Sequence, residues 1–431
     1  MSESFVIEGA RKLKGRIRPS GNKNEALPVL CATLLSAEPV TLHNVPRIAD
    51  VNVLLDIIIG LGGTVEELDS PNSLRICNKA LGPPEPSAEL CERIRASILL
   101  AGPLTGRCGS ILLPPPGGDV IGRRRVDTHF DGLQALGASF RQGDAYELSA
   151  PRGLQGTDFM LDEASVTATE NLVMAAVLAR GTTVLRNAAC EPHVQRLCHL
   201  LVGMGARIEG IASNTLTIEG VERLGGFEHT IGPDYLEVGS LIGLAACTDS
   251  DITIEGAGRA DLRMILHTFN RLGIHALPVG EDDLRVPSGQ PRVIKKDLNG
   301  AIPRIGDGIW PAFPTDLMSI AIVTATQCTG TVLFFEKMFE GRMFFTDRVI
   351  GMGASIILCD PHRVVVVGPT PLYHSQVDSP DVRAGMALVI AALCAKGTTT
   401  IGNIRQIDRG YERIDEKLGA LGAQIERVSG G

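Results

Sequence analysis

The chain has 431 residues, of which 44% are hydrophobic and 21% charged, a composition typical of globular proteins with large cores. At roughly 100–200 residues per domain, this length predicts about two to four domains. The net charge of −8 excludes a general attraction to nucleic acid or anionic membrane, and one Trp with four Tyr disfavours a base-stacking surface. An anionic ligand would therefore need a local cluster of Lys and Arg.

The sequence predicts a cytoplasmic protein that neither crosses nor enters a membrane. Its N-terminus, MSESFVIEGARKLKG, lacks the apolar core of a signal peptide. Its apolar runs are shorter than the roughly 20 residues that span a bilayer. Most of the ten cysteines lie in apolar runs without any C-x-x-C pair, so we expect reduced thiols packed in the core.

A short sequence motif, called here the repeated phrase, recurs along the chain at intervals of about 70 residues. An apolar helical pattern ends in Leu or Met followed by Gly, the residue that a left-handed helix C-cap favours, and a β-type segment follows. Strand-like phrases such as GTTVLRNAA and SDITIEGAG precede these helices. We therefore expect six helix-and-strand units, three in each of two similar domains. The six copies end at Leu61-Gly62, Leu136-Gly137, Met204-Gly205, Leu272-Gly273, Met352-Gly353 and Leu421-Gly422.

The first candidate ligand site follows the turn Pro19-Ser20-Gly21. Lys23 and Asn24 come next, at the start of an apolar run that predicts a helix. A helix N-terminus attracts anions and a lysine there strengthens the attraction, although a solvated lysine beside a capping asparagine would give the same pattern.

Two further segments combine arginines with a Pro/Gly loop. Arg95 stands beside a largely apolar stretch, where it is either a surface residue or an anion clamp. The run PPPGGDVIGRRRVDTHF, residues 114–130, presents the carboxylate of Asp119 beside three arginines. A mobile loop of this kind suits phosphate chemistry, and an exposed charged loop is the alternative.

The second half of the chain places isolated acids and arginines at expected turn-to-helix junctions. Asp316 opens an apolar helix in FPTDLMSIAI and could be an ordinary N-cap. The other pairs, which could also be surface ion pairs, are Glu340 with Arg342, Asp381 with Arg383, and Asp408 with Arg409. The sequence shows no metal-ligand spacing, P-loop, dinucleotide fingerprint or nucleophile elbow.

Several of these segments together resemble one family over essentially the whole chain. They are SGNKNEAL, RAS, PGG-x-x-IG-x-R-x-VD-x-H, ATEN-x-x-MAA, FPTD and DRGYERI-x-x-KL-x-ALGA. Through these segments the chain resembles the UDP-N-acetylglucosamine enolpyruvyl transferases (1-carboxyvinyltransferases). It resembles the 5-enolpyruvylshikimate-3-phosphate synthases more distantly.

The resemblance implies an α/β (α+β) fold with two domains, each an inside-out α/β barrel of three repeats. Residues 1–22 and 238–431 would form a discontinuous domain, and residues 23–237 an inserted domain. The inserted domain would carry a loop, residues 114–125, that closes over a cleft between the domains.

The resemblance also assigns roles to individual residues. It implies that Lys23, Asn24, Arg124 and Arg409 bind phosphoenolpyruvate, that Asp316 lies next to the accepting hydroxyl, and that Asp119 takes a loop position usually held by cysteine. Further substrate contacts are implied for Arg95, Arg124 to Thr128 (Arg124, Arg125, Val126, Asp127, Thr128), Ser165, Val166, Met338, Arg342, Asp381 and Arg383.

The implied reaction transfers the enolpyruvyl group of phosphoenolpyruvate to the 3-hydroxyl of UDP-N-acetylglucosamine, the first committed step of peptidoglycan synthesis. It needs one acid and one base in a site that neutralises a carboxylate and a phosphate. Asp316 would be the base, Asp119 or Lys23 would deliver the proton, and Arg409 would hold charge. No cofactor or metal is expected, and the oligomeric state stays open.

Three departures from the family pattern lie near the acceptor. Glu163 replaces a Lys, Leu99 replaces a Trp, and Arg125 replaces a Pro. An anion near a diphosphate weakens its binding, although Arg123 or Arg125 could compensate. Two alternatives follow: a relative that uses another acceptor such as UMP in secondary metabolism, and an inactive nucleotide-sugar-binding regulatory paralogue.

The aspartate in the loop predicts resistance to fosfomycin. A carboxylate is a poorer nucleophile toward the epoxide than the thiolate that normally traps this inhibitor. Incubation of the protein with fosfomycin followed by an activity measurement checks this expectation, and rapid irreversible inactivation would contradict it.

Overall fold

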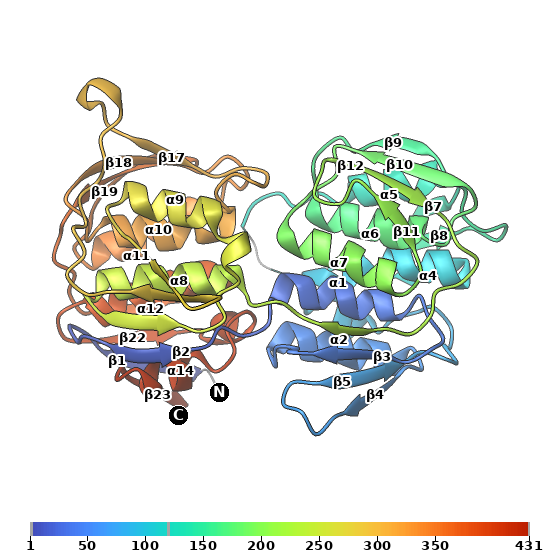
Figure 1. Cartoon of the computed structure of the whole chain (residues 1–431), viewed down its shortest axis with the longest axis horizontal. Coiled ribbons are helices and arrows are strands. Elements are labelled where there is room, and N and C mark those ends of the chain that lie inside the picture. The colour runs from blue at the N-terminus through green and yellow to red at the C-terminus, as the bar shows by residue number, and fades with distance from the viewer. Residues whose placement is uncertain (1–2, 119–120, 430–431) are drawn as a thin grey trace. The chain divides into compact units, whose positions relative to one another are not determined.

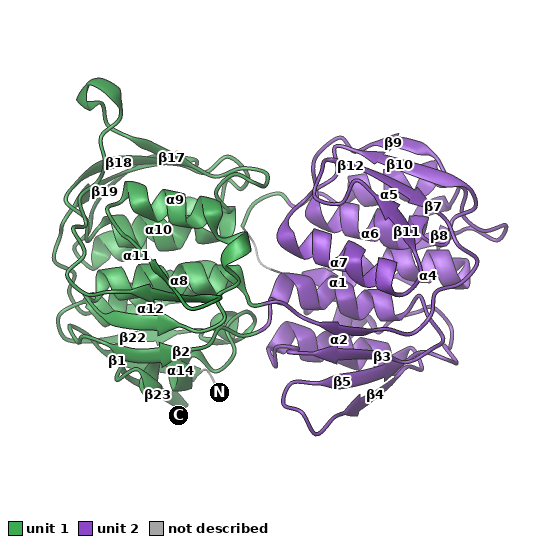
Figure 2. Ribbon diagram, viewed as in Figure 1, with its two compact units in different colours: residues 1–20, 120–123, 233–431 green, residues 21–119, 124–232 purple. Residues whose placement is uncertain are grey.

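The computed structural model describes residues 3–118 and 121–429 and divides the chain into two compact units (Figure 2). Unit 1 comprises Met1–Ser20, Val120–Arg123 and Pro233–Gly431, and unit 2 comprises Gly21–Asp119 and Arg124–Gly232. The division after residue 232 differs from the expected division after residue 237, because the latter falls inside helix α8 (Tyr235–Cys247). The boundary between the units therefore lies before the first residue of α8, and the whole helix belongs to unit 1.

All six expected helix ends are present. Each Leu or Met of the repeated phrase is the C-cap residue of a helix, and each following Gly has a positive φ between 77° and 108°. Such a backbone conformation favours glycine, which explains the phrase physically. The six helices are α2 (Ala49–Gly60), α5 (Asp127–Ala135), α7 (Pro192–Gly203), α9 (Arg263–Arg271), α11 (Thr346–Gly351) and α14 (Ile414–Ala420).

The strands of the described residues form six sheets, three in each unit. Five sheets share one pairing pattern, in which a parallel pair is followed by two antiparallel pairs, and the sixth lacks the parallel strand. The repeat is therefore one of pairing pattern as well as of sequence.

The sheets of unit 2 have the strand orders β13-β3-β5-β4, β9-β10-β12-β11 and β6-β8-β7. Their bounds are β3 (Val40–His43), β4 (Thr64–Glu67), β5 (Leu74–Cys77), β6 (Ser110–Leu113), β7 (Ser139–Gln142), β8 (Tyr146–Ser149), β9 (Asp158–Met160), β10 (Thr182–Arg186), β11 (Arg207–Glu209), β12 (Thr215–Glu219) and β13 (Glu228–Thr230).

The sheets of unit 1 have the strand orders β2-β14-β16-β15, β17-β18-β20-β19 and β21-β22-β1-β23. Their bounds are β1 (Glu3–Glu8), β2 (Lys14–Ile17), β14 (Asp251–Ile254), β15 (Leu277–Val279), β16 (Asp283–Val286), β17 (Arg304–Gly306), β18 (Gly330–Phe335), β19 (Ser355–Asp360), β20 (Arg363–Gly368), β21 (Gln376–Asp378), β22 (Thr398–Gly402) and β23 (Gln424–Ser429). Because β1 lies between β22 and β23, the N-terminus belongs to the unit built from the C-terminal half.

The most buried helices lie inside each unit, and the sheets lie outside them (Figure 1). Every residue of α8 and of α10 (Met318–Ala325) is buried, and so is nearly all of α12 (Val382–Cys394). A helix that is apolar on all sides needs cover on all sides, which the other inner helices and three separate sheets supply together, without the sheets closing into one continuous barrel. In unit 2 the inner helices are α1 (Lys23–Thr33), α4 (Ala101–Cys108) and α6 (Val166–Ala176).

Short helical segments complete the fold. They are α3 (Ala88–Cys91), α13 (Arg405–Asp408), and the 3₁₀ turns η1 (Arg95–Leu100), η2 (Arg259–Asp261), η3 (Leu298–Gly300), η4 (Thr315–Leu317) and η5 (Arg342–Phe345). Within the described part of the chain, no helix is both long enough and apolar enough to cross a membrane. Five of the free cysteines are buried as expected, but Cys108 and Cys359 are exposed.

The amide of Asn171 joins η1 to α6 inside unit 2. It donates to the carbonyl of Ile98 at 2.8 Å and accepts from the N–H of Gly102 at 2.7 Å, and all three groups are buried. Asn171→Ala leaves both backbone groups without a partner, so we expect the free energy of unfolding to fall by about 2–5 kcal/mol. Denaturation followed by circular dichroism measures this. Asn52→Ala, on the exposed face of α2, is the control and should change stability little.

Candidate active site

Lys23 is the first residue of α1, as the sequence predicted, and Asn22 caps the helix. The Asn22 side chain accepts from the N–H groups of Asn24 and Glu25 at 2.8 and 3.2 Å. The Lys23 ammonium forms an ion pair with Asp50 at 2.8 Å, and only 12% of the lysine side chain is exposed. The Lys23 side chain thus lies at the positive N-terminal end of α1, and the two together form a place where an anion can bind.

Arg95 opens η1 and fixes the end of the loop formed by residues 114–125. Its guanidinium donates to the backbone carbonyls of Arg124 and Arg125 at 2.8 and 3.1 Å. Burial, and then the nearby charge of Arg124, lowers the pKa of Arg95 to about 10. Gly117 approaches the Glu92 backbone so closely that a Cβ atom would lie 1.7 Å from its carbonyl oxygen, so only glycine fits there.

The segment Arg124 to Thr128 leads into α5 and is held by an acid that sequence reasoning missed. Asp162 accepts a hydrogen bond from the Thr128 hydroxyl and forms an ion pair with Arg125 at 3.0 Å. The hydrogen bond from Thr128, and then the Arg125 charge, lowers the pKa of Asp162. Arg125 also contacts Asp127 at 2.9 Å, so its charge is already balanced by two carboxylates. Val126 packs against the unit's core.

The N-terminus of α6 holds the remaining predicted contacts of unit 2. Ser165 caps this helix by accepting from the N–H of Ala168 at 3.3 Å, and Val166 is its first residue. Glu163 is exposed close to this cap. Leu99 is only 2% exposed and belongs to the core, so it does not line an open surface of the unit.

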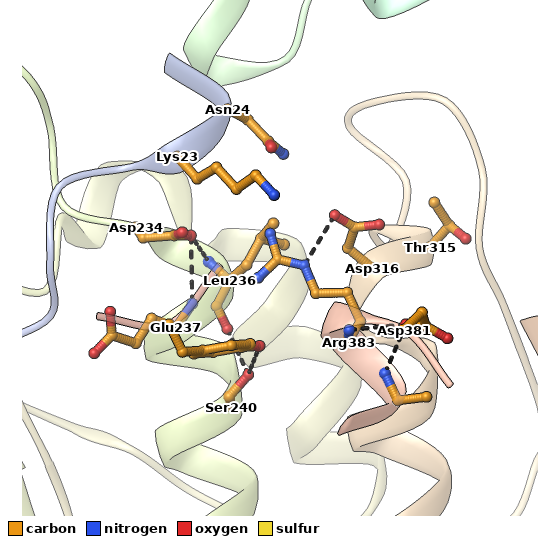
Figure 3. Close-up of polar contacts among 12 residues, drawn as sticks. Lys23, Asn24, Asp234, Leu236, Glu237, Ser240, Thr315, Asp316, Asp381 and Arg383 are labelled. Carbon is orange, nitrogen blue, oxygen red and sulfur yellow. Dashed lines mark hydrogen bonds and ion pairs between the residues drawn. The ribbon is translucent and has the colours of Figure 1, made fainter. Parts of the chain in front are cut away.

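In unit 1, Asp316 lies in η4 and is held by two arginines that are distant in sequence, one of which is Arg383 (Figure 3). Arg342 donates to one carboxylate oxygen at 2.8 Å, and Arg383 donates to the other at 3.2 Å. Both guanidinium side chains are almost fully buried, whereas 26% of the Asp316 side chain is exposed. The carboxylate is therefore fixed in orientation and open on one side, and it is not the N-cap that the sequence allowed.

Arg383 is held in turn by residues of α8, α12 and the C-terminal motif. Asp381 caps α12 by accepting from the N–H of Arg383 at 2.8 Å. The guanidinium lies 5.3 Å from the centre of the Tyr411 ring, and the Tyr411 hydroxyl is 3.0 Å from Ser240. Burial opposes the charge of Arg383, but Tyr411, Asp316 and Asp234 raise its pKa. Asp234 and Tyr411 were not singled out from sequence, because nothing in their spacing distinguishes a helix cap or a core tyrosine.

The other predicted residues of unit 1 lie near its loops. Arg409 follows α13, and its guanidinium donates to Gln406 at 2.9 Å. Met338 is 37% exposed and follows β18. Within the loop, Arg123 donates its N–H to Glu340 at 3.0 Å, while Ile121 accepts from the N–H of Gly341 at 3.0 Å. Asp119 lies outside the described residues.

The two arginines around Asp316 retain unused donors. Arg342 Nε and Arg383 Nη1 are buried and have no hydrogen-bond partner among residues 3–118 and 121–429. Each guanidinium thus keeps positive charge beside Asp316 that is only partly engaged in hydrogen bonds, and such charge attracts a ligand that carries phosphate or carboxylate oxygens. A fixed carboxylate between them suits proton abstraction from a hydroxyl.

The chain belongs to the EPSP synthase (3-phosphoshikimate 1-carboxyvinyltransferase) family, whose sequence profile matches residues 7–418. Among curated relatives, a UDP-N-acetylglucosamine 1-carboxyvinyltransferase of Bradyrhizobium diazoefficiens is 56% identical over 98% of both chains. Enzymes with the same name are 52% identical in Treponema denticola, over 98% of both chains, and in Bacteroides thetaiotaomicron, over 99% of this chain and 100% of the relative.

Solved structures show the same fold. The enolpyruvyl transferase NikO from Streptomyces tendae has a TM-score of 0.89 at 24% identity, with both chains fully covered. An EPSP synthase from Acinetobacter baumannii has a TM-score of 0.74 at 16% identity, again over both whole chains. These likenesses confirm the expected enolpyruvyl transferase fold.

His129, beside Thr128 in α5, is buried and contacts the Thr167 hydroxyl at 2.9 Å. Burial, and then the charge of Arg95, lowers its pKa to about 3. The unfolded chain binds this proton below about pH 6.5, but the folded chain does not, so stability must fall as pH falls through that range. We expect a slope of about 1.4 kcal/mol per pH unit, which His129→Gln removes.

Denaturation midpoints measured from neutral to mildly acidic pH give this slope. The exposed His199→Gln, on α7 of the same unit, serves as the control for losing a histidine and should keep the wild-type slope. An unchanged slope in His129→Gln would show that this imidazole takes up its proton in the folded protein.

Proposed function

We propose that this chain transfers the enolpyruvyl group of phosphoenolpyruvate to the 3-hydroxyl of UDP-N-acetylglucosamine and releases phosphate. The observation that carries the proposal is the carboxylate of Asp316, fixed by Arg342 and Arg383 with spare buried donors around it. The relatives' shared name over almost the whole chain supports the choice of acceptor. The reaction would be the first committed step of peptidoglycan synthesis.

The proposed reaction is an addition followed by an elimination. C3 of phosphoenolpyruvate gains a proton, and C2 becomes electrophilic. The acceptor hydroxyl attacks C2 and gives its proton to Asp316, so that a tetrahedral adduct forms. Loss of a proton from C3 then expels phosphate and restores the double bond. Lys23 or Asp119 delivers the first proton in this proposal.

In this proposal, cationic residues rather than a cofactor neutralise the carboxylate and the phosphate of phosphoenolpyruvate. Arg342 and Arg383 supply positive charge on unit 1, where Arg409 is also assigned to phosphoenolpyruvate. Lys23 at the start of α1 and Arg124 are assigned to it on unit 2. We place the enzyme in the cytoplasm, where the free thiols of the described residues would stay reduced.

The contacts of Arg125 affect which residues can bind the nucleotide diphosphate of the acceptor. Because Asp127 and Asp162 already balance its charge, Arg125 does not offset the exposed Glu163. The proposal therefore assigns the nucleotide diphosphate to other donors, among them the N–H groups at the start of α6. The sequence's alternatives, a UMP acceptor and an inactive paralogue, gain no support from the relatives' names.

Phosphate release tests the function and the base together. The protein is incubated with phosphoenolpyruvate and, separately, UDP-N-acetylglucosamine, UMP or shikimate 3-phosphate. Of the three acceptors, we expect only UDP-N-acetylglucosamine to cause phosphate release. We expect Asp316→Asn to lower kcat by about 10²–10⁴-fold. Asp297→Asn, which alters an exposed partner of Arg271 in the same unit, should retain activity. Release only with another acceptor, or with none, would contradict the proposal.

A further inference from the structure

Two buried acids lie side by side behind Asp316. Strands β17 and β18 are parallel, and Gly306 is paired with Phe335 at their C-terminal ends. The next residues are Asp307 and Glu336, and both are 0% exposed. Carboxyl groups are rarely buried completely without a cationic partner, so this pair requires a physical account.

The hydrogen bonds of the two acids leave one buried carboxylate oxygen without a donor. Asp307 Oδ1 accepts from the N–H of Lys337 at 2.6 Å, whereas Oδ2 is buried and receives no donor from the described residues. Asp307 and Glu336 directly follow a paired position of neighbouring parallel strands, and the printed cation beside them is Arg342, whose Nε lies 3.9 Å from Glu336. Two ionised carboxylates offer only acceptors, so a hydrogen bond between these neighbouring groups needs one proton.

Glu336 organises the backbone around the candidate base. Its carboxyl accepts from the Thr315 hydroxyl at 2.9 and 3.0 Å, and Thr315 directly precedes Asp316. It also accepts from the N–H groups of Met338 and Phe339 at 3.0 and 3.1 Å. Its other charged contact is Arg342, whose Nε lies 3.9 Å away and whose Nη2 donates to Asp316. One carboxyl group thus touches both the residue that precedes Asp316 and an arginine that holds it.

We propose that Asp307 and Glu336 share a single proton and act as positioning residues for Asp316, which they hold through Thr315 and Arg342. This inference rests on the proposed function, because it assigns Asp316 a catalytic role. Neither acid contacts the reacting atoms in this proposal. Loss of the shared proton places two negative charges side by side and disrupts the hydrogen bonds that fix η4.

The charged surroundings of the pair agree with one negative charge and not with two. Arg342 is the cation that faces it from η5, and Asp316 adds a further negative charge beyond that arginine. Lys337 packs against Gly306, and the His362 ring bonds the backbone carbonyl of Glu336 at 2.8 Å. Burial, and then Asp307, raises the pKa of Glu336 well above its usual range, to about 8, although Arg342 and Thr315 oppose the shift.

The proposal predicts an alkaline loss of activity that depends on the pair. We expect kcat of the wild type to fall as the pH rises through about 8, where the second charge appears. Asp307→Asn keeps an acceptor for Lys337 and donates an N–H to Glu336, so it replaces the shared proton. It should retain kcat near neutral pH to within about threefold, and its alkaline loss should move upward by at least about one pH unit.

Glu336→Gln provides a second variant if Asp307→Asn does not fold, because its amide also donates to the remaining carboxylate. Glu336→Ala removes the hold on Thr315 and should lower kcat at every pH. Glu170→Gln, which alters a buried acid in the core of unit 2, is the matched control and should keep the wild-type pH profile. An alkaline limb that is identical in wild type, Asp307→Asn and Glu336→Gln would overturn the proposal.

Infrared spectroscopy of the unliganded protein separates this inference from the proposed function. The difference spectrum between wild type and Asp307→Asn should contain the C=O stretch of a protonated carboxyl near neutral pH, and the band should vanish in alkali. That result supports the shared proton even if none of the tested acceptors reacts. Absence of the band would overturn the inference, even if phosphate release supports the proposed function.

Discussion

The constraint on which this structure depends is the burial of helices that are apolar on every side. α8 and α10 expose no residue, so each needs neighbours all around it. Neighbouring helices and three sheets in each unit supply that cover, and the helix ends are the places where polar side chains can occur without being buried in apolar surroundings. The starts of the inner helices lie within two residues of Lys23, Ser165, Asp316 and Arg383. The repeat therefore determines where functional residues can lie.

Buried charge in unit 1 is organised as a series of contacts rather than as isolated pairs. Arg383 joins Asp316 to Tyr411, while Arg342 joins Asp316 to Glu336. Each guanidinium would be costly to bury alone, and each has a carboxylate or an aromatic face beside it. Because the series reaches the surface at Asp316, the most exposed carboxylate in it is also the one fixed by two cations.

The sequence predicted the features that depend on local physics and missed those that depend on contacts between distant segments. The Leu/Met-Gly phrase identified six helix ends, since only a residue without Cβ adopts the required backbone readily. The helix starts at Lys23 and at Asp381-Arg383 were predicted from another local signal, polar residues directly before an apolar run. Asp162, Asp234 and Asp307 gave no local signal, because their partners lie 26 or more residues away or are ordinary backbone groups. Asp316 was recognised through the family motif and not through its contacts.

The contacts around Arg125 show why a substitution cannot be evaluated from charge alone. An arginine in place of proline adds a cation to the segment before α5, which suggests stronger binding of a diphosphate. In the structure that cation contacts Asp127 and Asp162, and Asp162 also accepts from Thr128. The added charge therefore stabilises the local turn instead of remaining available to a ligand. Arg95, at the start of η1, fixes the same turn because its guanidinium donates to the carbonyls of Arg124 and Arg125. These contacts make the segment rigid and leave little of its added charge unpaired, so in the proposed acceptor site rigidity matters more than net charge.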